Sequence, residues 1–243
     1  MRLIFLCLIL ISSIPQAIFS QKKKVAVVTF YTNKSVHLGF DVATELLTKE
    51  ILDVNENKDF NLAPILEQYH DRFFNEYAAD FPFDLLPENE VVENPDYINF
   101  QPKYESKKLF DYFAVTIKGY KYIYEGFMGK ENEVAVAKMF ADKADGVLFV
   151  NVDFSFDRTY GIAGVYNMKV LATTRISLYN KEGEKVFVVR ERARSKQNAT
   201  SLGMVPMIEP QEVLPMCESA LLELMNDLKK RIKKITRNAA KKL

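Results

Sequence analysis

The stretch Val150-Asn-Val-Asp-Phe-Ser-Phe-Asp157 decides the fold class. Apolar and polar residues alternate along it without a break, which is the period of a strand that buries one face and exposes the other. The polar face carries Asn151, Asp153, Ser155 and Asp157. We therefore expect a long strand that begins near Val147 and has a polar side opposite its core side.

The segments around this strand predict a helix before it and a hairpin after it. Residues 131–143 have a helical apolar period, and Gly146 follows them in a position typical of a helix C-terminus. Residues 158–167, with Gly161 and Gly164, read as a flexible loop. Residues 168–179 and 185–196 then predict a hairpin around the turn at 180–184.

The first part of the chain predicts a β-α-β unit. Residues 24–31 are a short β-rich run, and residues 36–52 have a helical period with Ser35 as a plausible N-cap. Phe60 to Leu66 read as the second strand. Such a unit implies parallel neighbouring strands and a right-handed crossover.

An aromatic, proline-rich insertion over about 73–105 separates this unit from the rest, and a helix is expected over 106–118. The aromatic rings of the insertion suit either core packing or a surface for a ligand or partner. The closing helix is expected over about 211–237. The sequence thus predicts one α/β (α+β) domain over 21–243, of the three-layer type with a mixed sheet, in the order β-α-β-α-β-β-β-α.

The N-terminus predicts export. Arg2, the apolar run Leu3 to Ile14 and the small residues up to Ser20 form a secretory signal peptide over 1–20. Cys7 lies within the apolar run, so it does not fit a lipid-acceptor position, and no later segment is long and apolar enough for a transmembrane helix. We expect a periplasmic or secreted protein in which Cys217 is the single remaining cysteine, without an intramolecular disulfide.

The charge of the chain argues against nucleic acid as a partner. Its 33 Lys and Arg nearly balance its 32 Asp and Glu, whereas a nucleic-acid-binding domain is strongly basic. The 48% of hydrophobic and 27% of charged residues are typical of a globular protein. The oligomeric state is not predicted.

Three local signatures resemble a known superfamily. They are Lys-Val-Ala-Val-Val-Thr-Phe at 24–30, Ala-Asp-Lys-Ala-Asp-Gly-Val-Leu-Phe-Val at 141–150, and Ile-Ser-Leu-Tyr-Asn-Lys-Glu-Gly-Glu-Lys-Val at 176–186. Together with the order of elements, they resemble exported α/β domains of the TolB N-terminal-domain type, which include the curli-secretion lipoprotein domain. The resemblance implies a non-enzymatic binding or assembly module of the cell envelope, with an envelope protein as partner. It implies no site residues.

No catalytic residues, metal ligands or cofactor are expected. The two histidines, His37 and His70, read as isolated surface residues rather than members of a hydrolytic triad. No clustered Cys and His ligands suit zinc. Gly161-Ile-Ala-Gly164 lacks the pattern of a phosphate-binding loop.

The candidate binding face is the polar side of the predicted sheet. Residues two apart on a strand share a face, so acidic and basic side chains gather there. The candidates are Asp153, Ser155, Asp157, Arg175, Arg190, Arg192 and Arg194. Two carboxylates on one strand also suit a divalent cation. The alternative function is therefore a small-ligand- or metal-binding domain, or a metal-assisted hydrolase using Asp153 and Asp157. Cross-strand ion pairing alone is the plainer explanation of this face.

The C-terminus carries eight cations, from Lys229 to Lys242, with no acid after Asp227. Cations at a helix C-terminus interact favourably with the helix dipole. An amphipathic basic helix also suits peripheral contact with a membrane surface.

Overall fold

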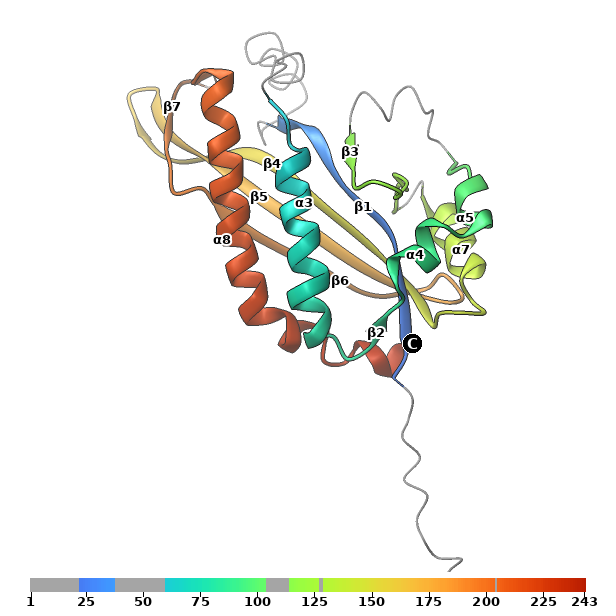
Figure 1. The fold of residues 1–243 in the computed structure, drawn as a ribbon. Coiled ribbons are helices and arrows are strands. Elements are labelled where there is room, and N and C mark those ends of the chain that lie inside the picture. Colours follow the sequence, from blue (N-terminus) through green and yellow to red (C-terminus); the bar gives the residue numbers. More distant parts are fainter. Residues whose placement is uncertain (1–21, 38–59, 104–113, 127–128, 204) are drawn as a thin grey trace, which may run out of the picture.

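The structure, a computed structural model, describes residues 22–37, 60–103, 114–126, 129–203 and 205–243 (Figure 1). The expected signal peptide at 1–20 and most of the helices expected over 36–52 and 106–118 lie outside these ranges. The predicted mixed α/β architecture is confirmed by an eight-stranded sheet that contains parallel and antiparallel pairs.

Within the described residues, eight strands make up the sheet. Their main spatial order is β2-β1-β4-β5-β7-β8, with β3 beside β1 and β6 beside β5. β1 runs parallel to β2 and β4, and the later strands are antiparallel to their neighbours. Their bounds are β1 Lys24–His37, β2 Asp84–Leu85, β3 Ala114–Thr116, β4 Gly146–Ile162, β5 Val165–Asn180, β6 Lys185–Arg194, β7 Ala199–Leu202 and β8 Val205–Met207.

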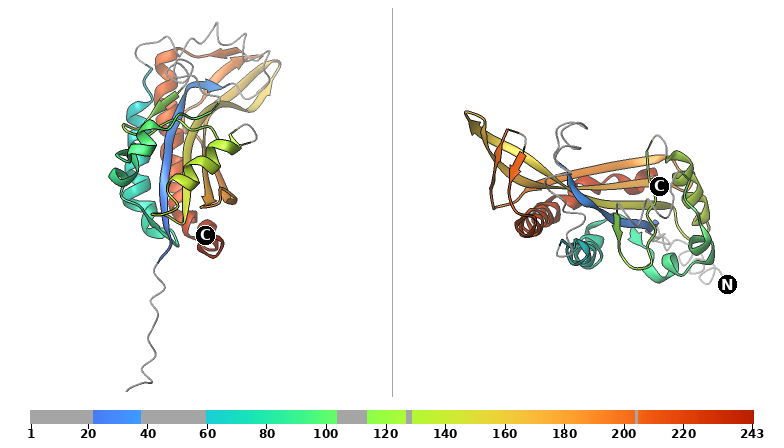
Figure 2. Two further views of the ribbon diagram at one scale, coloured as in Figure 1. Left: turned by 90° about the vertical axis from the view of Figure 1, so that its right-hand side faces the viewer. Right: turned by 90° about the horizontal axis from the view of Figure 1, so that it is seen from above.

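Helices cover the two faces of the sheet unequally. The helices are α3 Ala63–Arg72, α4 Glu88–Val92, α5 Pro95–Asn99, α7 Lys130–Met139 and α8 Pro210–Thr236. The long helices α3 and α8 lie side by side across one face, whereas α7 and the short α4 and α5 lie toward one end of the sheet (Figures 1 and 2). We call the face under α3 and α8 the helix-covered face and the opposite one the polar face.

The helix-covered face holds the main core. One side of β4 contributes Leu148, Val150, Val152, Phe154 and Phe156, all buried. The apolar stripe of α8 packs against them, including Leu221, Leu224, Leu228 and Ile232. Burial of each such side chain contributes about 1.5–3 kcal/mol, so this interface supplies much of the stability of the domain.

A smaller core lies at the opposite side of the sheet, where β1 and β4 begin and β5 ends. Val147 and Phe149 of β4 pack there with Val136 and Phe140, which belong to α7 and its end. Tyr97 of α5 is buried in this cluster, and its hydroxyl donates to the backbone oxygen of Val28 at 2.8 Å. From Asn151 onwards, the same side of β4 is polar.

The aromatic insertion over 73–105 contributes to the core. Its rings Phe73, Tyr77, Phe81, Phe83 and Tyr97 are buried, and Phe81 stacks on Phe83 with ring centroids 5.0 Å apart. A short π-helix at Phe73–Tyr77 and a 3₁₀ turn at Ala78–Asp80 continue α3 into it. Of the two interpretations of these rings, the buried positions favour core packing.

The prediction of a strand over Phe60 to Leu66 is wrong, because α3 begins at Ala63. The side chain of Asn61 accepts a hydrogen bond from the Ala63 backbone N–H at 3.0 Å, and Pro64 occupies the first turn. Both are helix-start features, since proline loses no intrahelical hydrogen bond there. The second strand parallel to β1 on that side is instead β2, at Asp84–Leu85.

Three further boundaries differ from the prediction. β1 continues to His37, so Ser35 and Val36 lie in a strand rather than at a helix start. Residues 114–116 form β3 rather than the end of a helix. The expected loop over 158–167 is the tip of the β4–β5 hairpin, where Ala163 and Gly164 have φ values of 53° and 86°. Positive φ at both central residues is typical of the tight turn that suits the twist of paired strands.

Candidate functional site: the polar face of the sheet

The register of β4, β5 and β6 brings the predicted site residues onto the polar face in three rows. Asn151 lies opposite Arg175, which lies opposite Arg190. In the next row, Asp153 is followed by Thr173 and Arg192. In the third row, Ser155 is followed by Leu171 and Arg194. Asp157 lies one step further along β4. The predicted acidic side chains of β4 and the basic side chains of β5 and β6 therefore share a face.

Asp153 is held by amides rather than by the arginines. Its carboxylate accepts hydrogen bonds from the Asn33 side chain at 2.7 Å and from the Asn151 side chain at 2.8 Å. Burial raises the pKa of Asp153, although His37 and these donors oppose the shift. This carboxylate thus belongs to a fixed polar cluster at the junction of β1 and β4.

Arg175 is held by a carboxylate that sequence reasoning missed. Glu125 forms an ion pair with Arg175, and accepts hydrogen bonds from the hydroxyls of Ser177 at 2.8 Å and Tyr179 at 2.9 Å. The side chain of Glu125 is only 9% exposed. Because Glu125 lies 50 residues before Arg175 in the chain, no local pattern pointed to this pairing.

Tyr179 links this cluster to helix α7. Its hydroxyl lies 2.9 Å from Glu125 Oε2 and 2.7 Å from Glu133 Oε1, and burial raises its pKa. Glu133 also accepts a hydrogen bond from the Gly126 backbone at 2.6 Å. A phenol has a single proton to donate, so it cannot donate to both carboxylates at once. The arrangement is therefore a buried polar network that fastens α7 to the sheet.

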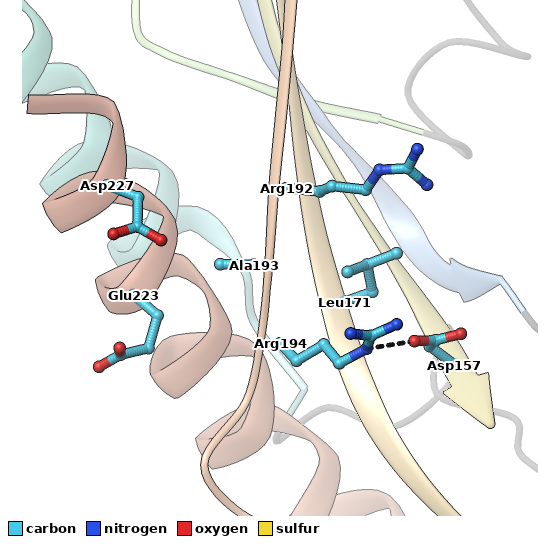
Figure 3. A pocket seen from close by; sticks show the side chains of 7 residues that line it. All are labelled: Asp157, Leu171, Arg192, Ala193, Arg194, Glu223 and Asp227. Atoms are coloured by element: carbon cyan, nitrogen blue, oxygen red, sulfur yellow. Dashed lines mark hydrogen bonds and ion pairs between the residues drawn. The ribbon is translucent and has the colours of Figure 1, made fainter. Parts of the chain in front are cut away.

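The arginines of β6 differ from Arg175 in their surroundings. Arg194 forms an ion pair with Asp157 on the polar face (Figure 3). Arg190 and Arg192 are exposed, and within the described ranges neither has a hydrogen-bond or ion-pair partner. Arg190 lies directly opposite Arg175, whose charge Glu125 offsets. This face therefore presents two guanidinium groups that have no partner in the part of the chain that the structure describes.

β6 is also an edge strand. It pairs with β5 on one side, and with no strand on the other side among the described residues. At its end, the Ser195 backbone N–H donates to the Val170 oxygen at 2.7 Å. In an antiparallel ladder, hydrogen-bonded and non-hydrogen-bonded pairs alternate. Since Ser195 is hydrogen-bonded to β5, the backbone N–H and C=O groups of residues 193, 191 and 189 also point to β5. The same groups of residues 194, 192, 190 and 188 point outward.

A hollow of ≈ 440 Å³ lies beside this edge. Three consecutive residues of β6, Arg192, Ala193 and Arg194, line it, although neighbours on a strand point to opposite faces. Figure 3 shows the two arginines on one side of the β6 ribbon and Ala193 on the other, toward Glu223 and Asp227 of α8. Asp157 and Leu171 complete the lining. The open space therefore borders the free edge on both faces.

The two histidines occupy different surroundings. His37 ends β1 opposite Ser155. The expectation of a surface histidine is wrong for His70, whose side chain is only 15% exposed. Its Nε2 lies 2.6 Å from Glu88 Oε1, and its ring packs edge-on against Phe30. His70 is thus part of the packing between α3 and the sheet.

The remaining candidates are ordinary structural features where the structure describes them. Cys217 is free and buried, and burial raises its pKa. Within the described ranges, no three His, Cys, Asp or Glu side chains gather as a metal site, and no helix is both long and apolar enough to cross a membrane. The apolar stripe of α8 faces the core, and three of its cations pair with Glu76, Asp227 and Glu191.

No protein-family model matches the chain, and no curated protein matches it. Among solved structures, it is similar to the lipoprotein GNA1162 from Neisseria meningitidis, with 12% identity and a TM-score of 0.27 over 84% of this chain and 99% of that chain. It is also similar to the hypothetical protein CT253 from Chlamydia trachomatis, with 9% identity and a TM-score of 0.24 over 87% of this chain and 98% of that chain. Similarities of this size establish neither a family nor a function.

Proposed function

We propose that this chain is an exported, non-enzymatic binding module of the cell envelope that recognises an anionic partner through the polar face of its sheet. The observation that carries the proposal is the pair Arg190 and Arg192, which are exposed and have no partner among the described residues. Arginine suits such a role because its planar guanidinium binds carboxylates and phosphates in a bidentate manner. The signal peptide predicted over 1–20 and the TolB-type resemblance of the sequence support the proposed envelope location.

The alternative is a metal site or a metal-assisted hydrolase built on Asp153 and Asp157. Two observations disfavour it. The Asp153 carboxylate already accepts two amide hydrogen bonds, and Asp157 is paired with Arg194. A cation would have to displace these donors. A thermal shift with Ca²⁺, Mg²⁺ or Mn²⁺ tests this alternative, since a ligand at a hundredfold excess over its Kd stabilises by about 2.7 kcal/mol.

Peripheral membrane contact through α8 is a separate proposal with less support. The apolar stripe of this helix is buried in the core, so only its exposed cations are available to anionic lipid. Co-sedimentation with anionic liposomes, with and without residues 229–243, tests it. Equal binding of the two forms removes the helix from consideration.

Affinity capture tests the proposed function directly. The bait is the chain from residue 21 onwards, and the prey is an envelope extract of the source organism. The double variant Arg190→Glu/Arg192→Glu is compared with Lys233→Glu/Lys234→Glu, which makes the same charge change on exposed residues of α8. We expect a stoichiometric protein that the wild type and the lysine variant retain and the arginine variant loses. Equal capture by all three baits, or capture of nothing, contradicts the proposal.

A further inference from the structure

The free edge of β6 and the arginine row along it, which consists of Arg190, Arg192 and Arg194, point to one kind of partner. We propose that β6 accepts an extended peptide segment as an additional strand, and that this segment carries acidic residues at every second position. The proposal rests on the proposed function, because it names the partner class for the same arginines. Strand addition of this kind draws affinity from main-chain hydrogen bonds and specificity from alternate side chains.

The arginines of β6 are also residues whose backbone groups point away from β5. The outward-pointing N–H and C=O groups belong to Val188, Arg190, Arg192 and Arg194, by the alternation that starts at the Ser195 bond. The side chains of these residues all lie on the polar face. An added antiparallel strand would therefore form its hydrogen-bonded pairs with the arginines themselves, and its partner residues would project on the arginine side.

The spacing of the arginines predicts the spacing of the acidic residues in the partner segment. Residues two apart on a strand are about 6.5–7 Å apart, and the same repeat applies to an added strand. Acidic residues at alternate positions then lie opposite Arg190, Arg192 and Arg194. Opposite charges directly across a sheet stabilise the pairing, whereas like charges destabilise it.

The intervening positions of the partner face a different environment. They lie on the side of Ala193, where the hollow beside β6 extends to Glu223 and Asp227. Ala193 is small and leaves room for a side chain, while the two carboxylates disfavour another acid. Acidic residues at consecutive positions are therefore excluded, and small polar or basic residues fit between them.

A second copy of the chain is a poor occupant of this edge. If two β6 strands paired antiparallel about a twofold axis, their polar faces would coincide, and arginine would lie opposite arginine. That arrangement places like charges across the ladder. The arginine row thus protects the edge from self-pairing and leaves it open to an acidic strand.

The test uses synthetic peptides and the chain from residue 21 onwards, with binding measured by calorimetry. The probe is an end-blocked nine-residue peptide of alternating glutamate and threonine. One control has the same composition with its glutamates contiguous. Two more carry N-methyl groups, on the glutamate nitrogens, which would face β6, or on the threonine nitrogens, which would point away from it.

We expect the alternating peptide to bind saturably. Methylation of the glutamate nitrogens or the Arg190→Glu/Arg192→Glu change should weaken binding by at least about tenfold, and methylation of the threonine nitrogens by less than about threefold. Val188→Pro, which removes one outward N–H and leaves the charges in place, should also weaken it. Proline is tolerated in an edge strand where its nitrogen faces solvent.

Several outcomes overturn the proposal. Equal binding of the two methylated peptides, or of the contiguous and alternating peptides, shows a general polyanion surface instead of strand addition. Absence of binding by the alternating peptide also overturns it. If the arginine variant nevertheless loses its partner from the envelope extract, strand addition fails and the proposed function stands. If both experiments fail, the proposed function falls as well.

Discussion

The two faces of β4 differ in chemistry and in burial. On the helix-covered face, apolar side chains such as Phe154 are buried under α3 and α8. On the polar face, the residues beyond Phe149 are hydrophilic and partly exposed, and side chains of β1 and β6 hold two of them: Asn33 donates to Asp153, and Arg194 forms an ion pair with Asp157. Burial of apolar area supplies far more free energy than exposed ion pairs do. The helix-covered face therefore stabilises the domain, whereas the residues of the polar face can vary with little cost in stability and are available for the proposed recognition.

The largest effect should come from truncation on the helix-covered face. Phe154→Ala removes a ring that is 1% exposed, so it should lower the free energy of unfolding by about 3–5 kcal/mol. Ser155→Ala, one residue along the strand and on the polar face, should change it by less than about 0.5 kcal/mol. Chemical denaturation of both variants measures the difference. Similar losses in the two variants would contradict the division between the faces.

A middle-sized effect should come from the network that joins α7 to the sheet. Tyr179→Phe removes the hydroxyl between Glu125 and Glu133, so that one of the two buried carboxylates loses a hydrogen-bond donor. The expected loss of unfolding free energy is about 1–3 kcal/mol. Tyr160→Phe is the matched control, because Tyr160 is 72% exposed on the hairpin. An equal, negligible effect of the two changes would show that the network does not stabilise the fold.

Asp153 should give a smaller effect that depends on pH. Its pKa is raised in the folded state by burial, so the folded state binds this proton more tightly than the unfolded chain does. The contribution of Asp153 to stability is therefore fully present below its ordinary pKa of 3.8 and is lost as pH rises through the raised value. The unfolding free energy of the wild type, relative to Asp153→Asn, should fall over that range. A rise instead would mean that the amide donors outweigh burial.

The smallest effect on stability should come from the arginines of β6. Because Arg190 and Arg192 are exposed and have no partners among the described residues, Arg190→Glu/Arg192→Glu should alter the unfolding free energy by less than about 0.5 kcal/mol. The same variant should lose binding to the acidic peptide and to the envelope partner. A large loss of stability would show that the two arginines serve the fold, which would weaken their assignment to recognition.

The sequence predicted the parts of the molecule in which the period of the side chains is strong. The alternation from Val150 to Asp157 placed both faces of β4 correctly, and the helix expected over about 211–237 is α8, which spans Pro210–Thr236. The strand predicted over Phe60 to Leu66 is wrong because a short apolar run suits either a strand or a helix. Asn61 and Pro64 are the residues in this run that indicate a helix start.

The arrangement of the candidate site was only partly predictable. Strand alternation placed Arg190, Arg192 and Arg194 on one side, but it did not show that their strand lies at an edge, which depends on the pairing of all strands. The partners of Glu125 lie 50 to 54 residues away in the chain. Contacts over such separations arise from the tertiary fold and leave no local pattern.

Amide hydrogen exchange along β6 in the free protein, resolved by NMR, tests the central claim most directly. An open edge predicts alternation: the amides of Val189, Glu191 and Ala193 are protected by β5, while those of Val188, Arg190 and Arg192 exchange rapidly. Uniform protection of all six amides would mean that the edge is already paired. In that case, the arginine row would not be available to a partner strand, and the account of the polar face as a recognition surface would be contradicted.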